Sequence, residues 1–333
     1  MMDKSVLKST AGGRKTSSLM KLSSRCRACR VERGARGSRT RLRASQATTR
    51  STSRLSPAPP KTRGEYASDK RSYVEEYVVS DCETIEEGNV VSPVIITKIV
   101  ESLAIGHFQK LSGDSSDVPR SKEMKELDLT FMLSRITFDF SELPQSDHQV
   151  EAETCFKPQK VSFKRDFAIR NKSTGATVAA VTSTYVLVNF KTRKLSIAPK
   201  EMVDLYKDFS TKDTSRLGLV LPRKSKLGSF TSEEAQLTKT FTVEESDIDL
   251  NGHVGATVYI HWILDSSESA SLETLKTLDI EYKQECFLGE KIQCYIQTSV
   301  TEEGKKEISH LIQTEEGNIL LRAKSVWLEN KTN

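Results

Sequence analysis

The chain has 333 residues with 50 basic and 45 acidic side chains, a formal net charge of +5. That length can bury one large or two small cores. No stretch approaches the run of about 18 apolar residues that a membrane-spanning helix needs, so the sequence predicts no membrane span. The six cysteines are scattered, which is typical of a reducing compartment rather than of a disulfide framework.

Residues 1–63 differ from the rest of the chain. They hold 17 Lys or Arg against two acidic residues, are rich in Ser and Thr, and end in a proline-rich stretch at 57–60. An Arg-rich, Ser-rich, acid-poor leader without an apolar core is typical of an organelle transit peptide rather than of a secretory signal. A nucleic-acid-binding arm has similar charge, but no nucleic-acid-binding domain follows it. Composition alone separates plastid from mitochondrial import poorly.

The first structured segment has helical periodicity over 93–111, with Ser92 as the expected N-cap and Pro93 at the first helical position. Strands are expected after it at 129–140, 150–156, 161–170 and 177–188, the last two joined by a turn at Gly175. A helix is expected at 199–209, followed by a linker over 210–235 that is rich in Ser, Lys and Thr.

The second half repeats this order. A helix is expected at 254–267, and strands at 275–285, 291–300, 306–314 and 319–328. Gly175 and Gly317 lie 142 residues apart, as do Tyr185 and Trp327, so the halves align over their last hairpins. One helix followed by an antiparallel sheet, given twice, indicates an α+β fold.

Chemistry is concentrated at the start of the second predicted helix. Asp249, Asn251 and His253 alternate along the chain, and Glu285 and Cys286 follow about 30 residues later. A helix N-terminus offers free backbone N–H groups that stabilise negative charge, as a reaction with an oxyanion requires. Asp and Asn are also ordinary turn and cap residues, and a lone histidine beside a helix is usually structural.

This segment resembles the active-site stretch of the plant-type acyl-ACP thioesterases (fatty acyl-ACP hydrolases). The family's pattern of Asp-x-Asn-x-His-Val, then Tyr-Ile-x-Trp, then a strand ending in Glu-Cys, is met here by 249–254, 259–262 and 280–286. Further similar segments lie in order at 129–136, 164–175 and 192–199. One departure is Gly255-Ala256, where the family has two asparagines, so hydrogen bonding at the start of this helix must differ.

The resemblance implies a tandem (double) hot-dog, in which two antiparallel sheets are each wrapped around a helix. It implies an N-terminal hot-dog at 70–209 that binds the acyl chain, a linker at 210–235 and a catalytic hot-dog at 236–330. The implied activity is hydrolysis of fatty acyl-acyl carrier protein (acyl-ACP) thioesters, which releases free fatty acid and ends chain elongation in the plastid (chloroplast stroma). Residues 1–63 are then a plastid transit peptide.

In that family the positions of Asp249, Asn251 and His253 are assigned to catalysis. The fourth group is either a nucleophilic cysteine, here Cys286, or a glutamate that activates water, here Glu285. Alternate residues of a strand face opposite sides, and Cys286 shares the apolar side with Leu278 and Ile280. An apolar row favours a buried thiol, so we expect Glu285 to act and keep Cys286 as the alternative nucleophile.

No cofactor and no metal site are expected. The expected partner is acyl carrier protein bearing a fatty acyl chain, with no nucleic acid, and a homodimer is left open. Residues 64–333 carry 33 basic and 43 acidic side chains, so docking of an acidic carrier would need local basic clusters. The best candidates are Lys191, Arg193, Lys194, Arg223, Lys224 and Lys226.

Three alternatives remain. A hot-dog dehydratase would share the fold, although the Asp-x-Asn-x-His spacing with a later Glu-Cys pair argues against it. A hot-dog acyl-CoA thioesterase would act on another carrier. A non-catalytic acyl-chain binding protein is kept open by the missing asparagine pair.

Overall fold

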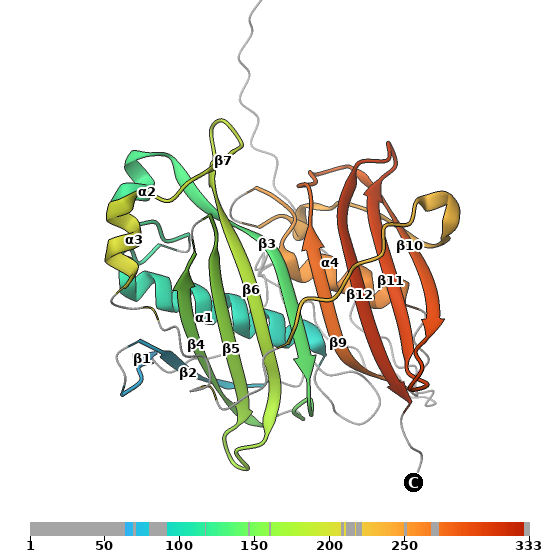
Figure 1. Ribbon diagram of the computed structural model, residues 1–333, viewed down its shortest axis with the longest axis horizontal. Helices are drawn as coiled ribbons and strands as arrows, with labels where there is room; N and C mark the ends of the chain where they lie inside the picture. Colours follow the sequence, from blue (N-terminus) through green and yellow to red (C-terminus); the bar gives the residue numbers. More distant parts are fainter. Residues whose placement is uncertain are drawn as a thin grey trace, which may run out of the picture. The chain divides into compact units, whose positions relative to one another are not determined.

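A computed structural model describes residues 64–68, 71–79, 92–116, 118–145, 147–159, 161–207, 210, 217, 222–249, 252–267 and 273–329 (Figure 1). The leader at 1–63, and with it the predicted transit peptide, lies outside the described residues. Among the described residues, no helix is both long enough and apolar enough to cross a membrane.

One antiparallel sheet carries most of the described chain. Its strands lie in the following order: β1 (Glu65–Tyr66), β2 (Tyr73–Val78), β4 (Gln149–Pro158), β5 (Phe163–Asn171), β6 (Thr177–Asn189), β3 (Leu129–Phe140), β9 (Glu273–Tyr282), β12 (Ile319–Glu329), β11 (Lys306–Thr314), β10 (Lys291–Val300) and β8 (Gln236–Thr242). A short strand, β7 (Lys194–Ser196), pairs with β6 beside this path. The two predicted sheets are therefore joined edge to edge through β3 and β9.

Four α-helices are found among the described residues. They are α1 (Pro93–Ser112), α2 (Lys122–Glu126), α3 (Lys200–Lys207) and α4 (Ala256–Ser266). The two longer ones, α1 and α4, contact each other and pack against the strands of their own halves (Figure 1). This arrangement of helix and sheet, given twice, confirms the predicted α+β class.

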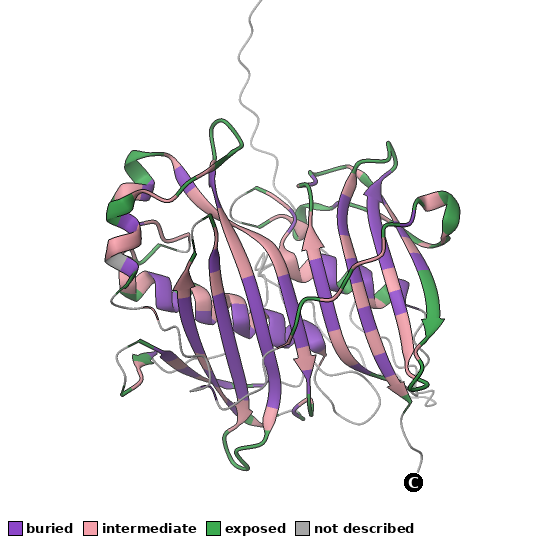
Figure 2. Cartoon of the chain, viewed as in Figure 1, coloured by how far each residue is buried: buried purple, intermediate pink, exposed green. Residues whose placement is uncertain are grey.

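Local chemistry explains where α1 begins and ends. The Ser92 hydroxyl accepts a hydrogen bond from the N–H of Val94 at 3.3 Å, and Pro93 takes the first position, where no N–H is needed. Gly113 closes the helix at φ +69°, a conformation that glycine adopts without a Cβ clash. The apolar stripe between these caps is buried (Figure 2). It joins a core cluster that also contains Tyr259 and Trp262 of α4, so the two halves share one core.

The seam between the halves is tied by a buried ion pair. Arg135 of β3 donates from Nε and Nη2 to the two carboxylate oxygens of Asp279 on β9, at 2.9 and 2.8 Å. Ser225 adds its N–H and hydroxyl to the same carboxylate at 2.6 and 2.8 Å. Burial alone would raise the pKa of Asp279, but these hydrogen bonds outweigh it and lower that pKa below its usual value.

The extended segment at 222–231 explains why Asp279 is buried. On a regular strand Asp279 and Glu281 face away from Leu278 and Ile280, so alternation predicts that they lie on the polar, solvent-facing side. Figure 1 shows this segment crossing in front of the sheet, and Arg322 donates to the carbonyl oxygens of Gly228 and Phe230 at 3.1 and 2.9 Å. The predicted polar face is therefore covered here by the chain that joins the halves.

We expect Asp279→Ala to lower the free energy of unfolding by about 3 kcal/mol, because it leaves the Arg135 guanidinium partly buried and unpaired. Asp139→Ala is the matched control, since Lys276–Asp139 crosses the same seam but is about one-third exposed; it should cost under about 1 kcal/mol. Urea unfolding of both variants measures this. The Asp279 contribution should be complete above about pH 4, the pKa of Asp in an unfolded chain, and should fade as the pH falls from there through the lower pKa of the folded carboxylate. Equal costs for the two variants would contradict the argument.

Candidate active site

The segment that precedes α4 forms a narrow loop closed by backbone pairing. Ile248 and Val254 form an isolated antiparallel bridge, and the N–H of Asp249 donates to the carbonyl oxygen of His253 at 2.7 Å. In return the His253 N–H donates to Asp249 Oδ1 at 3.2 Å. Gly252 turns the loop at φ +80°, where a side chain would be strained. Asp249 thus holds the backbone of His253 in place.

Asn251, predicted to act with these residues, lies outside the described residues. Gly255 is the N-cap of α4 and provides no side-chain hydrogen bond to the helix. The departure at Gly255-Ala256 therefore leaves the first turn of α4 without a side-chain acceptor from its cap. A Cβ at Gly255 would come no closer than 3.8 Å to its neighbours, so the absence of a side chain there is not a steric requirement.

The structure brings Glu285 to His253. Glu285 Oε2 lies 3.5 Å from His253 Nε2, and the two side chains are only 20% and 18% exposed. The Phe287 ring packs edge to face with the imidazole, with ring centroids 5.9 Å apart. A carboxylate and an imidazole at this separation, partly shielded from water, can both exchange a proton with one small molecule bound beside them.

The strand that was predicted to carry Glu285 ends earlier than expected. Alternation suggested a strand over 275–285, but β9 ends at Tyr282, and the N–H groups of Lys283 and Gln284 both donate to the carbonyl oxygen of Leu320, at 2.8 and 3.2 Å. Two donors on one acceptor break the regular register. The predicted boundary was wrong, although Glu285 and Cys286 still point into different surroundings.

Cys286 is fully buried in the shared core. Its Sγ lies 3.1 Å from the hydroxyl of Tyr259 on α4, and burial raises the pKa of the thiol to about 11. With that pKa only about one thiol in a thousand would be ionised at pH 8, and the thiolate is the nucleophilic form. The environment of Cys286 is that of a core residue.

Arg193, predicted to dock the carrier, contacts both His253 and Glu285. Arg193 places Nη2 2.7 Å from His253 Nε2 and Nη1 3.0 Å from Glu285 Oε1. It belongs to the turn between β6 and β7, in the half of the chain that does not contain His253 (Figure 1). From the sequence, Arg193 was predicted to belong to a basic docking cluster together with Lys191. Lys191 instead pairs with Asp128 at 2.7 Å.

Glu101, a carboxyl outside the motif, lies close enough to Asp249 for the charge of Asp249 to change the pKa of Glu101. Burial and the negative charge of Asp249 together raise the pKa of Glu101, on α1, to about 7. Burial, and after it the charge of the same carboxyl, raises the pKa of Tyr282, whose buried hydroxyl has no hydrogen-bond partner among the described residues. Polar groups of α1 and β9 therefore lie near the loop of Asp249.

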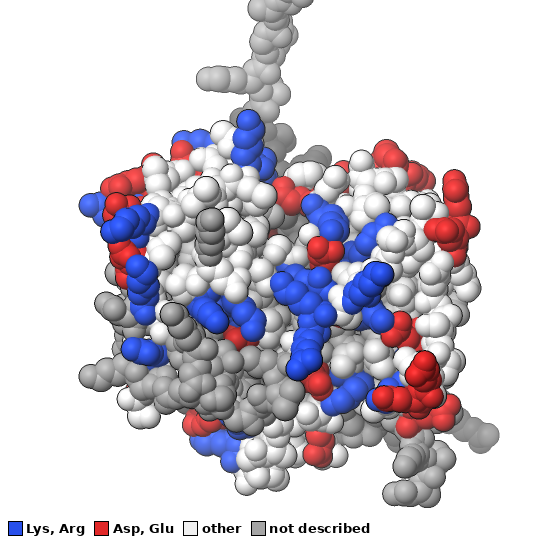
Figure 3. Space-filling view, viewed as in Figure 1, with Lys and Arg blue, Asp and Glu red and all other residues white. Residues whose placement is uncertain are grey.

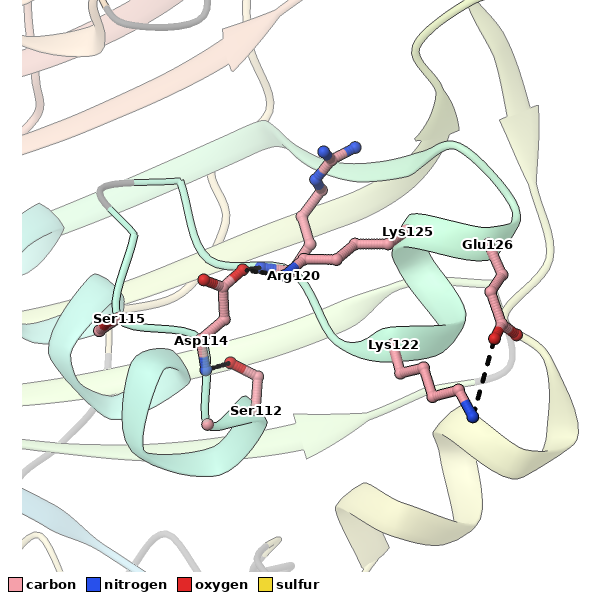
Figure 4. Close-up of a pocket in the computed structure, with 8 residues that line it drawn as sticks. Ser112, Asp114, Ser115, Arg120, Lys122, Lys125 and Glu126 are labelled. Carbon is pink, nitrogen blue, oxygen red and sulfur yellow. Dashed lines mark hydrogen bonds and ion pairs between the residues drawn. The ribbon is translucent and has the colours of Figure 1, made fainter.

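A surface pocket at the C-terminal end of α1 contains none of these residues (Figure 4). Its centre is Asp114, which accepts from the N–H of Arg120 at 2.9 Å and pairs with Lys125 at 2.9 Å. The hydrogen bond from the Arg120 backbone, followed by that from Lys125, lowers the pKa of Asp114. The charge of Asp114 is thus compensated by neighbouring residues of the same segment, and these contacts serve to fold the turn.

Comparison with known proteins gives the family. The sequence profile of the acyl-ACP thioesterase N-terminal domain matches residues 70–206, and that of the acyl-ACP thioesterase C-terminal domain matches residues 230–329. The chain therefore belongs to the acyl-ACP thioesterase family, as the motif suggested.

Two relatives show how the chain compares in length. The chain is 26% identical over 233 residues to acyl-[acyl-carrier-protein] hydrolase FATB2, chloroplastic, of Cuphea viscosissima, a match that covers 68% of this chain and 56% of that protein. It is also 26% identical over 237 residues to oleoyl-acyl carrier protein thioesterase 2, chloroplastic, of Arabidopsis thaliana, covering 69% and 64%. The match thus spans less than two thirds of either relative.

Solved structures confirm the tandem hot-dog fold. The 12:0-ACP thioesterase from Umbellularia californica superimposes with a TM-score of 0.68 at 22% identity, covering 78% of this chain and 94% of that one. An acyl-ACP thioesterase from Bacteroides thetaiotaomicron gives 0.65 at 18% identity, covering 79% and 100%. Both sequence identities are below 25%, so these two similarities establish the fold alone.

Proposed function

We propose that the chain hydrolyses fatty acyl-ACP thioesters and that it does so at the cluster of His253 and Glu285. The observation that carries this proposal is the approach of Glu285 Oε2 to His253 Nε2, next to the N-terminus of α4. Both relatives named above are acyl-carrier-protein thioesterases by name. Release of free fatty acid from the carrier would end elongation of the acyl chain.

The chemistry needs a water molecule within reach of both side chains. Glu285 takes one proton from this water, and the water oxygen forms a bond to the carbonyl carbon of the thioester. The carbonyl oxygen becomes an oxyanion, which the first-turn N–H groups of α4 can stabilise. The C–S bond then breaks, and the proton passes through His253 to the departing thiolate. Asp249 holds His253 through the backbone, and Asn251 is proposed to orient the water.

The acyl chain is proposed to lie against the N-terminal half. The candidate lining residues from the sequence are Met124, Phe131, Met132, Leu133 and Ile136. In support, Met124 and Phe131 belong to one apolar cluster together with Phe108 of α1, whereas Ile136 belongs to the core that both halves share. A fatty thioester requires an apolar wall for its chain as well as a polar cluster for its carbonyl.

Incubation of the purified chain with acyl-ACPs of graded chain length tests this function directly. We expect release of free fatty acid, with a maximum at one chain length that the assay identifies. Faster hydrolysis of the matching acyl-CoAs would favour the acyl-CoA thioesterase alternative. Binding of acyl-ACP without release of fatty acid would favour the non-catalytic acyl-chain binding protein.

Docking of the acidic carrier is proposed to use the segment that joins the halves. Arg223, Lys224 and Lys226 are exposed there, and Figure 3 shows basic side chains gathered in the middle of this face, where the segment crosses β3 and β9. This local charge opposes the net charge of −10 of residues 64–333. The other predicted cluster is less suitable, because Lys191 and Arg193 are engaged within the protein.

Import into the plastid is proposed from the composition of residues 1–63 and from the chloroplastic relatives. We expect residues 1–63 fused to a fluorescent protein to direct it into plastids and to be removed there. Microscopy and the size of the recovered fusion measure both events. Fluorescence in mitochondria, or diffuse in the cytosol or nucleus, would contradict the proposal.

A further inference from the structure

The turn that carries Arg193 is built to hold this residue in one conformation. Arg193 has φ +57°, a left-handed conformation that costs a residue with a side chain about 1 kcal/mol. The Asn189 side chain accepts from the N–H groups of Lys191 and Thr192, at 3.1 and 2.9 Å, and donates to the carbonyl oxygen of Leu127 at 3.0 Å. The Arg193 N–H donates to the Asn189 carbonyl oxygen at 2.8 Å. The strained residue is therefore fixed by its own turn.

A guanidinium group has donors only, which sets the state of the imidazole beside it. Because Arg193 Nη2 lies 2.7 Å from His253 Nε2, that nitrogen must be the acceptor, and the neutral ring must carry its proton on Nδ1. Nε2 then carries no proton to donate to Glu285 Oε2, which lies 3.5 Å away, and two acceptors this close repel unless a cation contacts both of them. Arg193 provides that cation, since its Nη1 donates to Glu285 Oε1.

We propose that Arg193 is a positioning residue of the hydrolytic site, reaching across from the N-terminal half to hold the His253 proton on Nδ1 and to leave Glu285 Oε2 as the proton acceptor. Without Arg193, the imidazole would carry its proton on Nε2 and donate it to Glu285. The carboxylate oxygen would then be engaged in that hydrogen bond and could not accept from water. With Arg193 in place, the single lone pair of Nε2 is engaged by the guanidinium, and a water that enters beside the pair meets Glu285 Oε2 as its proton acceptor. This inference rests on the proposed hydrolysis of acyl-ACP at the same site.

Two observations separate this role from that of an ordinary surface ion pair. Arg193 is 47% exposed, so its ion pair with Glu285 contributes little to stability. Such a pair alone would hardly offset the free-energy cost of the left-handed backbone at Arg193. The fork of two nitrogens also matters, because one nitrogen reaches His253 and the other reaches Glu285. A lysine offers a single nitrogen and can satisfy one contact only.

Nitrogen-15 NMR of the histidine side chains tests the contact without reference to activity, with the His253 signal identified from its loss in His253→Gln. In the wild-type chain we expect a proton on Nδ1 and none on Nε2. In Arg193→Ala the Nε2-protonated form should become the major one, and Arg193→Lys should lie between. Lys191→Ala, in the same turn but paired with Asp128, should leave the signal unchanged. An unaltered His253 signal in Arg193→Ala would overturn the inference.

Kinetics on acyl-ACP provide the second arm. Arg193→Ala should lower kcat about 10- to 100-fold with KM changed less than about threefold, because the substrate still binds but the bases are misplaced. Arg193→Lys should recover part of kcat, and Lys191→Ala should match the wild type. A raised KM with unchanged kcat would overturn the inference in favour of a docking role. If the wild-type chain releases no fatty acid while the NMR result is as expected, the proposed function fails and the contact stands.

Discussion

His253→Ala should abolish release of fatty acid from acyl-ACP, with a loss of at least about 100-fold in kcat. The imidazole lies 3.5 Å from Glu285, and in the proposed reaction it delivers the proton to the leaving thiolate. Binding of acyl-ACP should be nearly unchanged, because the side chain is only 18% exposed and the acyl chain is proposed to lie elsewhere. Steady-state kinetics and a binding titration with acyl-ACP measure the two effects.

The fold control for this variant is the circular dichroism spectrum together with the unfolding midpoint. Asp249 bonds to the backbone of His253 rather than to its ring, so the loop should survive the substitution. Retention of more than about a tenth of the wild-type turnover would remove His253 from the proton path.

Glu285→Ala should be nearly inactive, whereas Cys286→Ala should keep most of the activity. Glu285 is the carboxylate that reaches His253, and its loss leaves no base beside the water. Cys286 is buried, and its thiol has a pKa raised to about 11, so it stays protonated at neutral pH. Comparison of kcat for the two variants on one acyl-ACP measures the difference, which we expect to exceed about 50-fold.

The free energy of unfolding should show the opposite order, with the larger loss in Cys286→Ala and the smaller loss in Glu285→Ala. Cys286→Ala removes a buried sulfur from the shared core and should cost about 1 to 2 kcal/mol in the free energy of unfolding. Glu285→Ala removes a partly exposed ion pair and should cost less than about 1 kcal/mol. An active Glu285→Ala beside an inactive but folded Cys286→Ala would reverse the assignment and favour covalent catalysis.

Features that depend on neighbouring residues were predictable from the sequence. The strand at 129–140 matches β3 in both bounds, and the strands at 291–300 and 306–314 match β10 and β11. Ser92 and Pro93 begin α1 as expected, because caps act within one turn of the helix. Burial of Cys286 followed from its place in an apolar row, even though the strand itself ended three residues earlier.

Features that depend on distant partners were not predictable. Arg193 and His253 are 60 residues apart, in different halves, and only the folded chain brings them together. Asp279 has the strand position of a solvent-facing residue, yet Ser225 and Arg135 bury it. The short strands β1, β2, β7 and β8 were missed, and β8 alternates weakly because it lies at the edge of the sheet and is mostly exposed. The domain boundaries at 209–210 and 235–236 stay predictions.

The mass of the intact protein, measured on samples quenched during turnover of acyl-ACP, tests the central claim most directly. The claim is that water, activated by Glu285 and His253, attacks the thioester without an acyl-enzyme. Free fatty acid should therefore accumulate over time while the protein keeps its unmodified mass, in the wild type and in Cys286→Ala. A protein heavier by one acyl group, with the acyl group on Cys286, would contradict the account, as would a wild-type chain that releases no fatty acid.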